Sequence, residues 1–414
     1  MTQPGSEVRP DPGPGADRSP RTVLVIVFAT ILIDFVGFSV LVPVLPLYAE
    51  RLGAAPHQVG LILTIYALTQ LLFLPAWGWV SDRIGRRPVL LFSLFGTAVS
   101  FALLAYADTI HMIYAARALG GFFAASIGTA QAVVTDVTSS RERAGGMGAI
   151  GAAFGAGMIL GPVLGGTLAV FDEKAPFYAV AALATANLVL AYFKLPETRA
   201  RDVRPPRWRE LGMSFIPTPL RLLAAVHDRR RGLYLYLFFH LFTAFAVVEA
   251  LVTLYLAISF GADELDVAFV FAWIGAVMVF TQGYLVSRLV RALGEVNLVV
   301  LGIGAMGVGL VGVALAPSLD WFYAIGTIIA LGNGLAFPSF TSLYSRACEA
   351  EQAGALLAES QSMATAGRIV GPYAAGLVME WWNPGTPFWM AGVMMFAALG
   401  VFWVARATLV EGLP

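Results

Sequence analysis

The chain has 414 residues and no net charge, and 58% of its residues are hydrophobic while only 13% are charged. Its mean hydropathy is +0.77. Soluble domains average about 25% charged residues, so the composition excludes a water-facing surface over most of the chain. A neutral chain gives no electrostatic reason to expect a nucleic acid partner, and one cysteine excludes an intrachain disulfide and a CxxC metal site.

Apolar runs dominate the sequence, and a transmembrane helix needs about 20 mostly apolar residues. We predict an all-α membrane protein with twelve such helices, at residues 22–48, 59–80, 88–107, 111–135, 146–170, 176–194, 232–260, 265–287, 295–315, 320–344, 355–379 and 386–406. They form a six-helix bundle at 22–194 and a second at 232–406, joined by a linker at 195–231. Tails at 1–21, which is rich in proline and glycine and predicted to be disordered, and at 407–414 flank them.

The linker carries many arginines and four apolar residues at helical spacing, Trp208, Leu211, Phe215 and Ile216. Two interpretations stay open for it. It forms an amphipathic helix at the membrane interface, or it is a plain connecting segment.

Loop charges predict the orientation, since cytoplasmic loops carry an excess of lysine and arginine. With both termini inside, all of the 26 lysines and arginines are cytoplasmic except Arg51 and Lys174 outside and Arg117 and Arg368 within helices. We therefore expect a multi-pass protein of the cytoplasmic (inner) membrane with both termini in the cytoplasm.

Two patterns occur once in each half of the chain at nearly the same offset. Gly157-x3-Gly161-Pro162 recurs as Gly367-x3-Gly371-Pro372, and the run from Gly78 to Arg83 recurs as Gly283 to Arg288. Two parallel six-helix repeats with a site between them near the membrane midplane are a transporter architecture.

The link between predicted helices 2 and 3 is short, charged and rich in glycine. It runs Gly78-Trp79-Val80-Ser81-Asp82-Arg83-Ile84-Gly85-Arg86-Arg87-Pro88. Asp82 is placed to pair with a basic residue and to cap a neighbouring helix, where exposed N–H groups favour a carboxylate. The glycines and charged residues of this link are Gly78, Asp82, Arg83, Gly85, Arg86 and Arg87.

Four charged residues lie well away from the ends of predicted helices: Asp34, Arg117, Glu249 and Arg368. An arginine within a membrane costs about 2.5–3.5 kcal/mol on insertion scales, so Arg117 either faces a cavity or a carboxylate or reaches the interface from near the end of its helix. Burial disfavours the charged form of Asp34, which suits a proton carrier, although a neutral structural aspartate fits too. Glu249 and Arg368 each need a partner or a wet cavity, and a pair between them is one solution.

Predicted helix 5 carries small residues at intervals that let helices approach closely in lipid. The motif consists of Gly148, Gly157, Gly161, Pro162, Gly165 and Gly166. Ordinary helix packing explains any one of these glycines, and Pro162 can bend the helix.

These motifs together resemble the major facilitator superfamily, in its drug/proton antiporter branch, and most of all the bacterial tetracycline-efflux-like transporters. The resemblance covers residues 22–406 and rests on the Gly78–Pro88 loop, the stretch from Arg117 to Ala125, the helix-5 glycines, and Asp34 with Pro43 and Pro46. It implies two half-bundles that alternate in access and proton coupling through Asp34, Glu249, Arg117 and Arg368. The resemblance further implies that the link between helices 2 and 3 is a gating loop that latches the bundles in the outward-facing state, with Gly78, Asp82, Arg83, Gly85, Arg86 and Arg87 as its residues. It also implies a substrate cavity formed by helices 1, 4, 7 and 10, for which the candidates are Phe35, Gln131, Phe245, Asn333, Phe337 and Phe340.

Three positions depart from the family pattern. Gly120 stands where the helix-4 motif usually has glutamine, and Ser100 stands where tetracycline exporters carry an acid in helix 3. Glu249 is not a feature of those exporters. These departures count against tetracycline itself as the cargo.

The leading hypothesis is export of small amphipathic, drug-like compounds in exchange for protons, by a monomer in the lipid bilayer. The proton gradient is the expected energy source, and no cofactor, metal or nucleic acid is expected. The alternatives are a metabolite uniporter or proton symporter of the same fold, and a non-transporting membrane sensor or scaffold. We do not expect an enzyme, since the sequence has no HExxH, GxSxG or GxxxxGK[ST] motif.

Overall fold

The computed structural model describes most of the chain, namely residues 20–138, 143–198, 229–346 and 353–410. The predicted first tail lies almost wholly outside these ranges, and so does the predicted amphipathic segment around Trp208.

The first half of the chain forms one bundle of helices. Their bounds are α1 Pro20–Arg51, α2 Pro56–Ile84, α3 Arg86–Ala105, α4 Ile110–Phe122, α5 Ser126–Val137, α6 Arg143–Ala169 and α7 Ala175–Lys194. The second half forms the other bundle. Its elements are α9 Arg229–Phe260, α10 Glu264–Phe280, η1 Thr281–Leu285, α11 Val286–Leu293, α12 Glu295–Leu315, α13 Trp321–Arg346, α14 Ala353–Trp381 and α15 Thr386–Val410.

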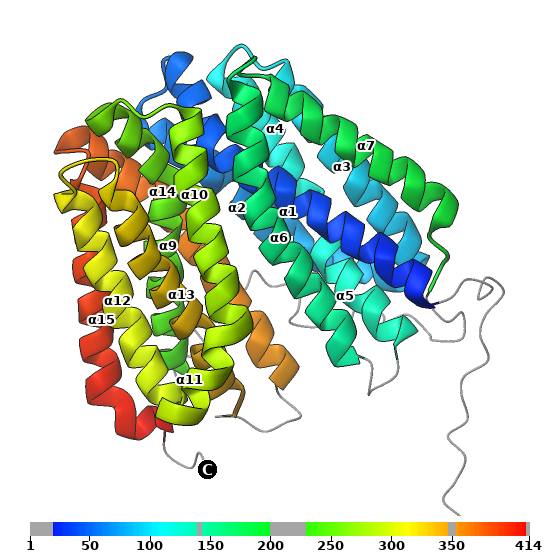
Figure 1. The fold of residues 1–414 in the computed structure, drawn as a ribbon. Coiled ribbons are helices and arrows are strands. Elements are labelled where there is room, and N and C mark those ends of the chain that lie inside the picture. The colour runs from blue at the N-terminus through cyan, green and yellow to red at the C-terminus, as the bar shows by residue number, and fades with distance from the viewer. Residues whose placement is uncertain (1–19, 139–142, 199–228, 347–352, 411–414) are drawn as a thin grey trace, which may run out of the picture.

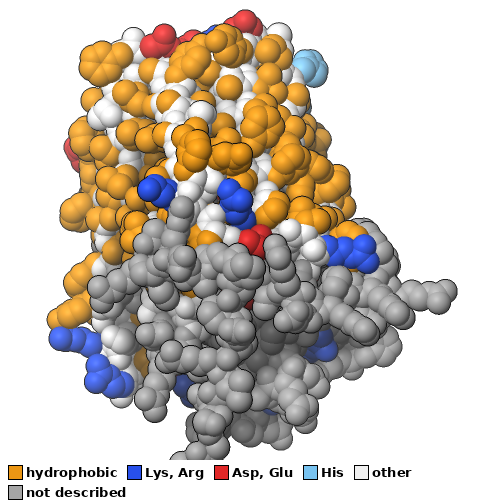
Figure 2. Space-filling view, turned by 90° about the vertical axis from the view of Figure 1, so that its right-hand side faces the viewer, with side chains coloured by type: hydrophobic (Ala, Val, Ile, Leu, Met, Phe, Trp, Pro, Cys, Tyr) orange, Lys and Arg blue, Asp and Glu red, His pale blue; other side chains and the backbone are white. Residues whose placement is uncertain are grey.

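The all-α fold predicted from the sequence is confirmed. Eleven segments of the described chain are long and apolar enough to cross a membrane, and α14, which carries Arg368, is a twelfth long helix. Figure 2 shows one face as a broad belt of hydrophobic side chains, with acidic side chains along its upper edge and most of the visible arginine and lysine side chains below it.

Two predicted helices are less regular than their apolar pattern suggests. Predicted helix 4 is broken into α4 and α5 by residues 123–125. Predicted helix 8 runs through α10, the π-helical turn η1 and α11. Neither break contains a proline, which would have signalled an interrupted helix. The apolar pattern alone therefore did not predict them.

The two bundles lie closer together at one end than at the other (Figure 1). We call the end that carries the link between α2 and α3 the inner end, and the end that carries the link between α1 and α2 the outer end. Between the bundles, α2 packs on α14 and α6 packs on α10. Close approach depends on glycine here, since a Cβ on Gly60 would collide with the backbone carbonyl of Pro372.

The repeat seen in the sequence is also a repeat of packing. In the first bundle, Gly157 and Gly161 of α6 lie against Phe35 and Ser39 of α1. In the second bundle, Gly367 and Gly371 of α14 both lie against Thr243 of α9. Each bundle therefore uses its glycine pair to seat its fifth predicted helix on its first.

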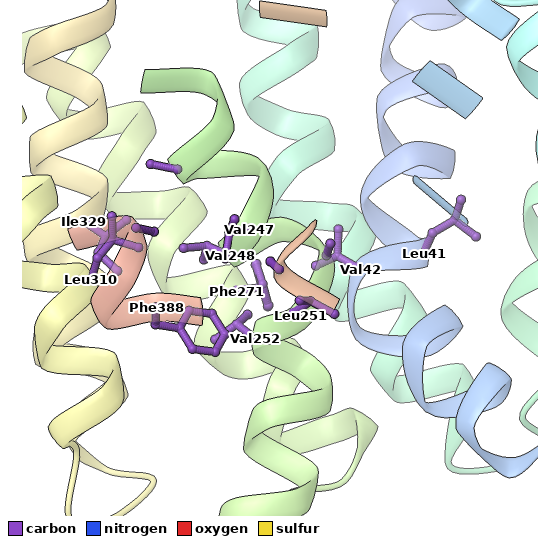
Figure 3. Close-up of a cluster of buried hydrophobic side chains, with 14 of the residues drawn as sticks. Leu41, Val42, Val247, Val248, Leu251, Val252, Phe271, Leu310, Ile329 and Phe388 are labelled. Atoms are coloured by element: carbon purple, nitrogen blue, oxygen red, sulfur yellow. The ribbon is translucent and has the colours of Figure 1, made fainter. Parts of the chain in front are cut away.

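Buried hydrophobic side chains continue from one bundle into the other. Figure 3 shows Val42 of α1 beside α9, which carries Val248 and Leu251. The Thr253 hydroxyl of α9 donates to the Val42 carbonyl at 2.9 Å. A hydroxyl is thus satisfied within this apolar contact, which holds α1 against the second bundle.

Candidate functional site

Two of the predicted intramembrane charges form an ion pair. Arg368 Nη2 of α14 lies 3.1 and 3.2 Å from the two carboxylate oxygens of Glu249 of α9. Glu249 is 6% exposed, and the Arg368 guanidinium also lies 5.2 Å from the ring centre of Phe38 in α1. The Glu249–Arg368 pair belongs to the second bundle, and its arginine contacts the first bundle through the Phe38 ring.

Arg117 of α4 is buried, at 3% exposure, and takes a different kind of partner. Its guanidinium lies over the ring of Tyr66 in α2, 4.2 Å from the ring centre. Its Nε atom is buried without a hydrogen-bond partner among the described residues. The structure thus favours the buried interpretation of this arginine over one that reaches the interface, and a cation–π contact is its main stabilising interaction.

Arg117 and Glu249 both line a small cavity between the bundles. Its other walls are apolar and come from α1 and α2: Phe38, Leu41, Val42, Leu45, Pro46, Val59, Ile62 and Leu63. The cavity volume is about 20 Å³, room for about one water molecule. Drug-sized ligands need pockets of about 300–1,000 Å³, so this part of the path is closed in the observed conformation.

Tyr66 is the functional candidate that sequence reasoning missed. It interacts electrostatically with Arg117 and Asp34 of its own bundle and with Arg368 and Glu249 of the other. Its place near these charges depends on how five helices pack, namely α1, α2, α4, α9 and α14. The one signal in the sequence was a tyrosine within a predicted transmembrane helix.

Asp34 lies apart from the ion pair. Its carboxyl group is close to Ser126, and its Oδ2 atom is buried with no hydrogen-bond partner in the described part of the chain. No arginine forms a salt bridge with it there, as arginine does with Glu249. A buried carboxyl oxygen without a partner is costly inside a membrane unless the group binds a proton or takes part in function.

The break in predicted helix 4 positions Ser126 next to Asp34. The Ser93 hydroxyl of α3 donates to the Phe123 carbonyl at 2.5 Å, and the Trp77 indole N–H of α2 donates to the Phe122 carbonyl at 2.5 Å. Irregular backbone inside a membrane is stable only when its polar groups are satisfied in this way. Ser126 then begins α5 on the far side of the break.

Two of the departures from the family pattern are in contact. Ser100 of α3 is buried and donates to the Ala116 carbonyl of α4 at 2.8 Å. A Cβ on Gly120 would lie 2.8 Å from the Ser100 hydroxyl oxygen. The small residues at these two positions therefore fit each other, and a larger side chain at either one would have to displace the other.

The six predicted cavity residues are not brought together at the cavity beside Arg117. Phe340 is 2% exposed and packs against Tyr234 and Phe238 in the core of the second bundle, so the structure places it away from a cavity wall. Phe35 lies edge-on to Phe154 at the contact of α1 with α6.

The remaining cavity candidates differ in exposure. Phe337 lies edge-on to Phe242, at 5.2 Å between ring centres. Phe245 is half-buried and Asn333 is buried, while Gln131 is exposed. The structure leaves these four residues, and Phe35, as predictions of a substrate site.

The gating loop forms its contacts within the first bundle. Arg86 Nη1 lies 2.5 Å from the Asp82 carboxylate, and Arg86 Nε lies 3.3 Å from that of Asp136 in α5. The Glu197 carboxylate accepts hydrogen bonds from the backbone N–H groups of Arg86 and Arg87 at the start of α3, at 2.9 and 3.2 Å. Asp82 therefore pairs with a basic residue as predicted, while Glu197 occupies the helix start.

The other residues of the gating loop contact aromatic residues or face open space. The Arg83 guanidinium lies 4.3 Å from the ring centre of Trp79, and Arg87 donates to the Tyr192 carbonyl at 2.6 Å. A Cβ on Gly78 would meet open space. Gly85 has a φ of 110°, which only glycine adopts readily.

The glycines of the helix-5 motif divide by partner. Gly157, Gly161 and Gly165 pack against α1, whereas a Cβ on Gly166 would collide with Ala268 of α10 in the other bundle. Gly148 faces open space, and Pro162 lies within the helix. The motif thus joins α6 both to its own bundle and to the other.

Ion pairs that the sequence did not predict join the bundles at the outer end. Arg51 of α1 pairs with Glu264 of α10 in the second bundle and, at 2.9 Å, with Glu173 of the first. His57 of α2 lies 2.5 Å from Glu380 of α14. The outer end is therefore closed by contacts between the bundles.

Two helical bundles with matching internal packing, and buried charges where they meet, define a secondary transporter fold. A family model for the Major Facilitator Superfamily matches residues 27–358, and the chain belongs to that superfamily.

Relatives of known name are drug-resistance proteins. The class C tetracycline resistance protein of Escherichia coli is 29% identical over 91% of this chain and 95% of its own length. The class G protein of Vibrio anguillarum is 31% identical over 85% and 89% of the two chains. Multidrug resistance protein 2 of Bacillus subtilis is 25% identical over 93% and 95%. The predicted superfamily and its efflux-like branch are therefore confirmed.

Solved structures share the fold. The human organic anion transporter MFSD10 matches with a TM-score of 0.68 at 25% identity, over 93% of this chain and all of that one. A bacterial homologue of the lysosomal transporter Spinster has a TM-score of 0.78 at 14% identity, over 95% and 98% of the two chains.

Proposed function

We propose that the protein exports small amphipathic compounds in exchange for protons, by rocking its two bundles about the buried charges between them. The carrying observation is the Asp34 carboxyl group, whose Oδ2 atom is buried without a hydrogen-bond partner in the described chain; Tyr66 lies within electrostatic range of this group and of the Glu249–Arg368 pair. A carboxyl group in this setting stabilises itself by binding a proton. Release of that proton changes the charge balance around Tyr66, which gives proton binding a route to both bundles.

The relatives support the direction and the type of cargo. Proteins named for resistance to tetracycline and to multiple drugs match this chain over nearly its whole length. The apolar walls around Arg117 suit a largely hydrophobic compound. Ser100 stands where tetracycline exporters carry an acid, and this difference counts against tetracycline itself as the cargo.

We extend the proposal to the setting in which the protein works. The protein acts as a monomer in the cytoplasmic membrane with both termini inside, it uses the proton gradient without a cofactor, and it catalyses no chemical reaction. The orientation is supported by the distribution of lysine and arginine in the loops.

Asp34→Asn tests the proton site, because asparagine keeps the shape of the side chain and cannot exchange a proton. We expect gradient-driven efflux from proteoliposomes to fall to background while the purified protein keeps its unfolding temperature. Asn187, which is buried and hydrogen-bonded to Thr30 at 3.2 Å, offers a control: Asn187→Asp adds a carboxyl group elsewhere and should not restore efflux to the Asp34→Asn protein. Wild-type efflux by Asp34→Asn would exclude Asp34 as the carrier.

Reversing the imposed pH gradient separates export from uptake. An antiporter moves substrate against the direction of proton flow, so substrate flux must change direction with the gradient and oppose it. Flux in the same direction as protons would show symport, and flux that ignores the gradient would show uniport.

A further inference from the structure

Two aromatic rings lie between the buried arginines of the two bundles. The Arg117 guanidinium lies over the Tyr66 ring of α2, and the Arg368 guanidinium lies 5.2 Å from the centre of the Phe38 ring of α1. The centres of these two rings are 6.4 Å apart, with their planes at 48°. Because Arg368 also holds Glu249, the contacts form a continuous series through α4, α2, α1, α14 and α9.

Phe38 lies on the face of α1 that meets the second bundle. It precedes Val42 by four residues, so the two side chains share a helix face. The Val42 carbonyl accepts the hydrogen bond from Thr253 of α9, and both Phe38 and Val42 line the cavity between the bundles. The Phe38 ring therefore belongs to the contact of α1 with the second bundle.

Arg368 lies at an equally close contact on α14. The carbonyl of the next residue, Ile369, accepts a hydrogen bond from the Thr64 hydroxyl of α2 at 2.8 Å. One turn closer to the outer end, the Pro372 carbonyl occupies the space that Gly60 of α2 leaves open. Arg368 thus lies on the surface that holds the two bundles together, and opening of the outer end has to move it away from α1.

The contact of Phe38 with Arg368 is more than apolar packing. A guanidinium within about 6 Å of a ring centre is attracted by the negative charge of the ring face, and the attraction grows where water is excluded. A leucine in place of Phe38 would leave the ion pair of Arg368 with Glu249 intact but would remove this attraction. The ring therefore contributes a charge-dependent contact between bundles whose other contacts here are apolar or hydrogen-bonded.

We propose that Phe38 is a positioning residue, which holds the Glu249–Arg368 pair against the first bundle by this cation–π contact and so keeps the outer end closed. Tyr66 supports the Phe38 ring from α2 and holds the Arg117 charge on its other side. The inference rests on the proposed function in one respect, that the bundles rock to open the outer end. It requires neither proton coupling through Asp34 nor a particular cargo.

The opening of the outer end can be measured by cysteine labelling. Val59 lines the cavity and is 1% exposed, so a cysteine there reacts with a membrane-impermeant maleimide, added from outside, only when the outer end opens. Val59→Cys is made in a Cys348→Ser chain and labelled in right-side-out vesicles, with no substrate and no pH gradient. Phe38→Leu should raise the labelling rate by about fivefold, the effect of a cation–π contact near the limit of its range. Phe38→Tyr keeps the ring face and should label near the rate of the Val59→Cys parent.

Fluorinated phenylalanine at position 38 separates the cation–π contact from packing. Each fluorine withdraws electron density from the ring face and nearly preserves the shape of the ring, so one, two and three fluorines should raise the labelling rate in steps. Phe177 offers the matched control, because it is a fully buried ring of the first bundle that packs against Tyr48 at 5.6 Å between ring centres. No arginine of the described helices lies over it. Three fluorines on Phe177 should therefore leave the rate unchanged.

A labelling rate that does not depend on the number of fluorines at position 38 would overturn the proposal and make Phe38 an apolar spacer. An equal rise from fluorinated Phe177 would overturn it as well. The fluorinated variants keep the shape of the ring, so they remain informative if Phe38→Leu does not fold. Because the assay uses neither substrate nor proton gradient, its outcome is independent of the efflux result for Asp34→Asn, and the two proposals can fail separately.

Discussion

The links between the second and third predicted helices of each bundle have the same geometry and opposite charge. In the first bundle Arg86 reaches Asp136 of α5, at 3.3 Å. In the second bundle Glu295 begins α12 and pairs with Arg346 of α13, at 2.9 Å. Acid and base have exchanged places across the repeat, so tethering the link to a neighbouring helix needs a pair of charges but no particular polarity.

The difference between the links lies in a second acid. Asp82 shares Arg86 in the first bundle. In the second bundle Ser287, which matches Asp82 in the sequence repeat, donates to the Tyr284 carbonyl, and Arg291, which lies three residues before Gly294 as Asp82 lies three before Gly85, donates to the Ser287 carbonyl at 3.1 Å. The charge pair common to both links tethers each link to a neighbouring helix, and we predict that Asp82, which adds an acid to the first link alone, serves gating. Four sets of variants test this division.

Reversing the charge of Arg86 should have the largest effect. Arg86→Glu places a fourth carboxylate beside Asp82, Asp136 and Glu197. Because a single broken pair that is largely buried already destabilises strongly, we expect the free energy of unfolding to fall by about 2 kcal/mol or more. Transport in vesicles should be lost, and thermal unfolding in detergent measures the stability change.

The charge swap Arg86→Glu with Asp136→Arg gives the first link the polarity of the second. We expect it to recover most of the unfolding temperature and little of the transport, since Asp82 then faces a glutamate. Recovery of transport together with stability would show that Asp82 needs no cationic partner.

Neutralising Asp82 should have the next largest effect, and on rate more than on stability. Asp82→Asn weakens a charged hydrogen bond to Arg86, and we expect transport to slow by about tenfold if that bond contributes only in one conformation. Ligand-dependent stabilisation across a compound panel should keep the same order of compounds. Ser287→Ala is the control in the second link and should transport at the wild-type rate; a changed binding profile in Asp82→Asn would make Asp82 a substrate contact instead.

The sequence predicted the repeated fold better than the site within it. Apolar runs fix where helices cross a membrane, because the bilayer sets their length, so predicted helix 9 and α12 share the bounds 295–315. Charges inside those runs identified Asp34, Arg117, Glu249 and Arg368, since each is costly in lipid. A pair between Glu249 and Arg368 was one solution that the sequence allowed, and the structure shows it.

What the sequence did not predict depends on contacts between distant helices. Tyr66 and the link from Arg51 to Glu264 join segments far apart in the chain, and no local pattern encodes them. The break before Ser126 depends on donors from Ser93 and Trp77 in other helices. Aromatic residues in apolar runs were the weakest guide, because Phe340 packs in a core as readily as it would line a cavity.

Adding a methyl group to the glycine of each link should have a smaller effect and should separate the two bundles again. Gly85 and Gly294 have φ values of 110° and 77° with extended ψ, a region that is essentially restricted to glycine and costs other residues about 1–3 kcal/mol. A Cβ on Gly85 would also collide with the Glu197 carboxylate, whereas one on Gly294 would meet open space.

We therefore expect Gly85→Ala to lower the unfolding temperature more than Gly294→Ala does. Adding Glu197→Ala to Gly85→Ala should reduce the difference in unfolding temperature between Gly85→Ala and Gly294→Ala, because it removes the carboxylate with which the new methyl group collides. Equal losses in the two single variants would mean that Glu197 moves aside freely and does not hold the start of α3.

Removing the charge of Glu295 should have the smallest effect. Arg346 is about half exposed, at 52% of its side chain, and exposed pairs of this kind contribute about 0–1 kcal/mol. The Ser342 hydroxyl donates to the same carboxylate at 2.8 Å, and the amide oxygen of Glu295→Gln can still accept that bond. We expect the unfolding temperature to change little and transport to stay near the wild-type rate, measured in the same vesicles as Asp82→Asn. A slowing as large as that of Asp82→Asn would mean that the second link gates transport as well. The polarity of the charge pair, and not the extra acid Asp82, would then have to explain how the two links differ.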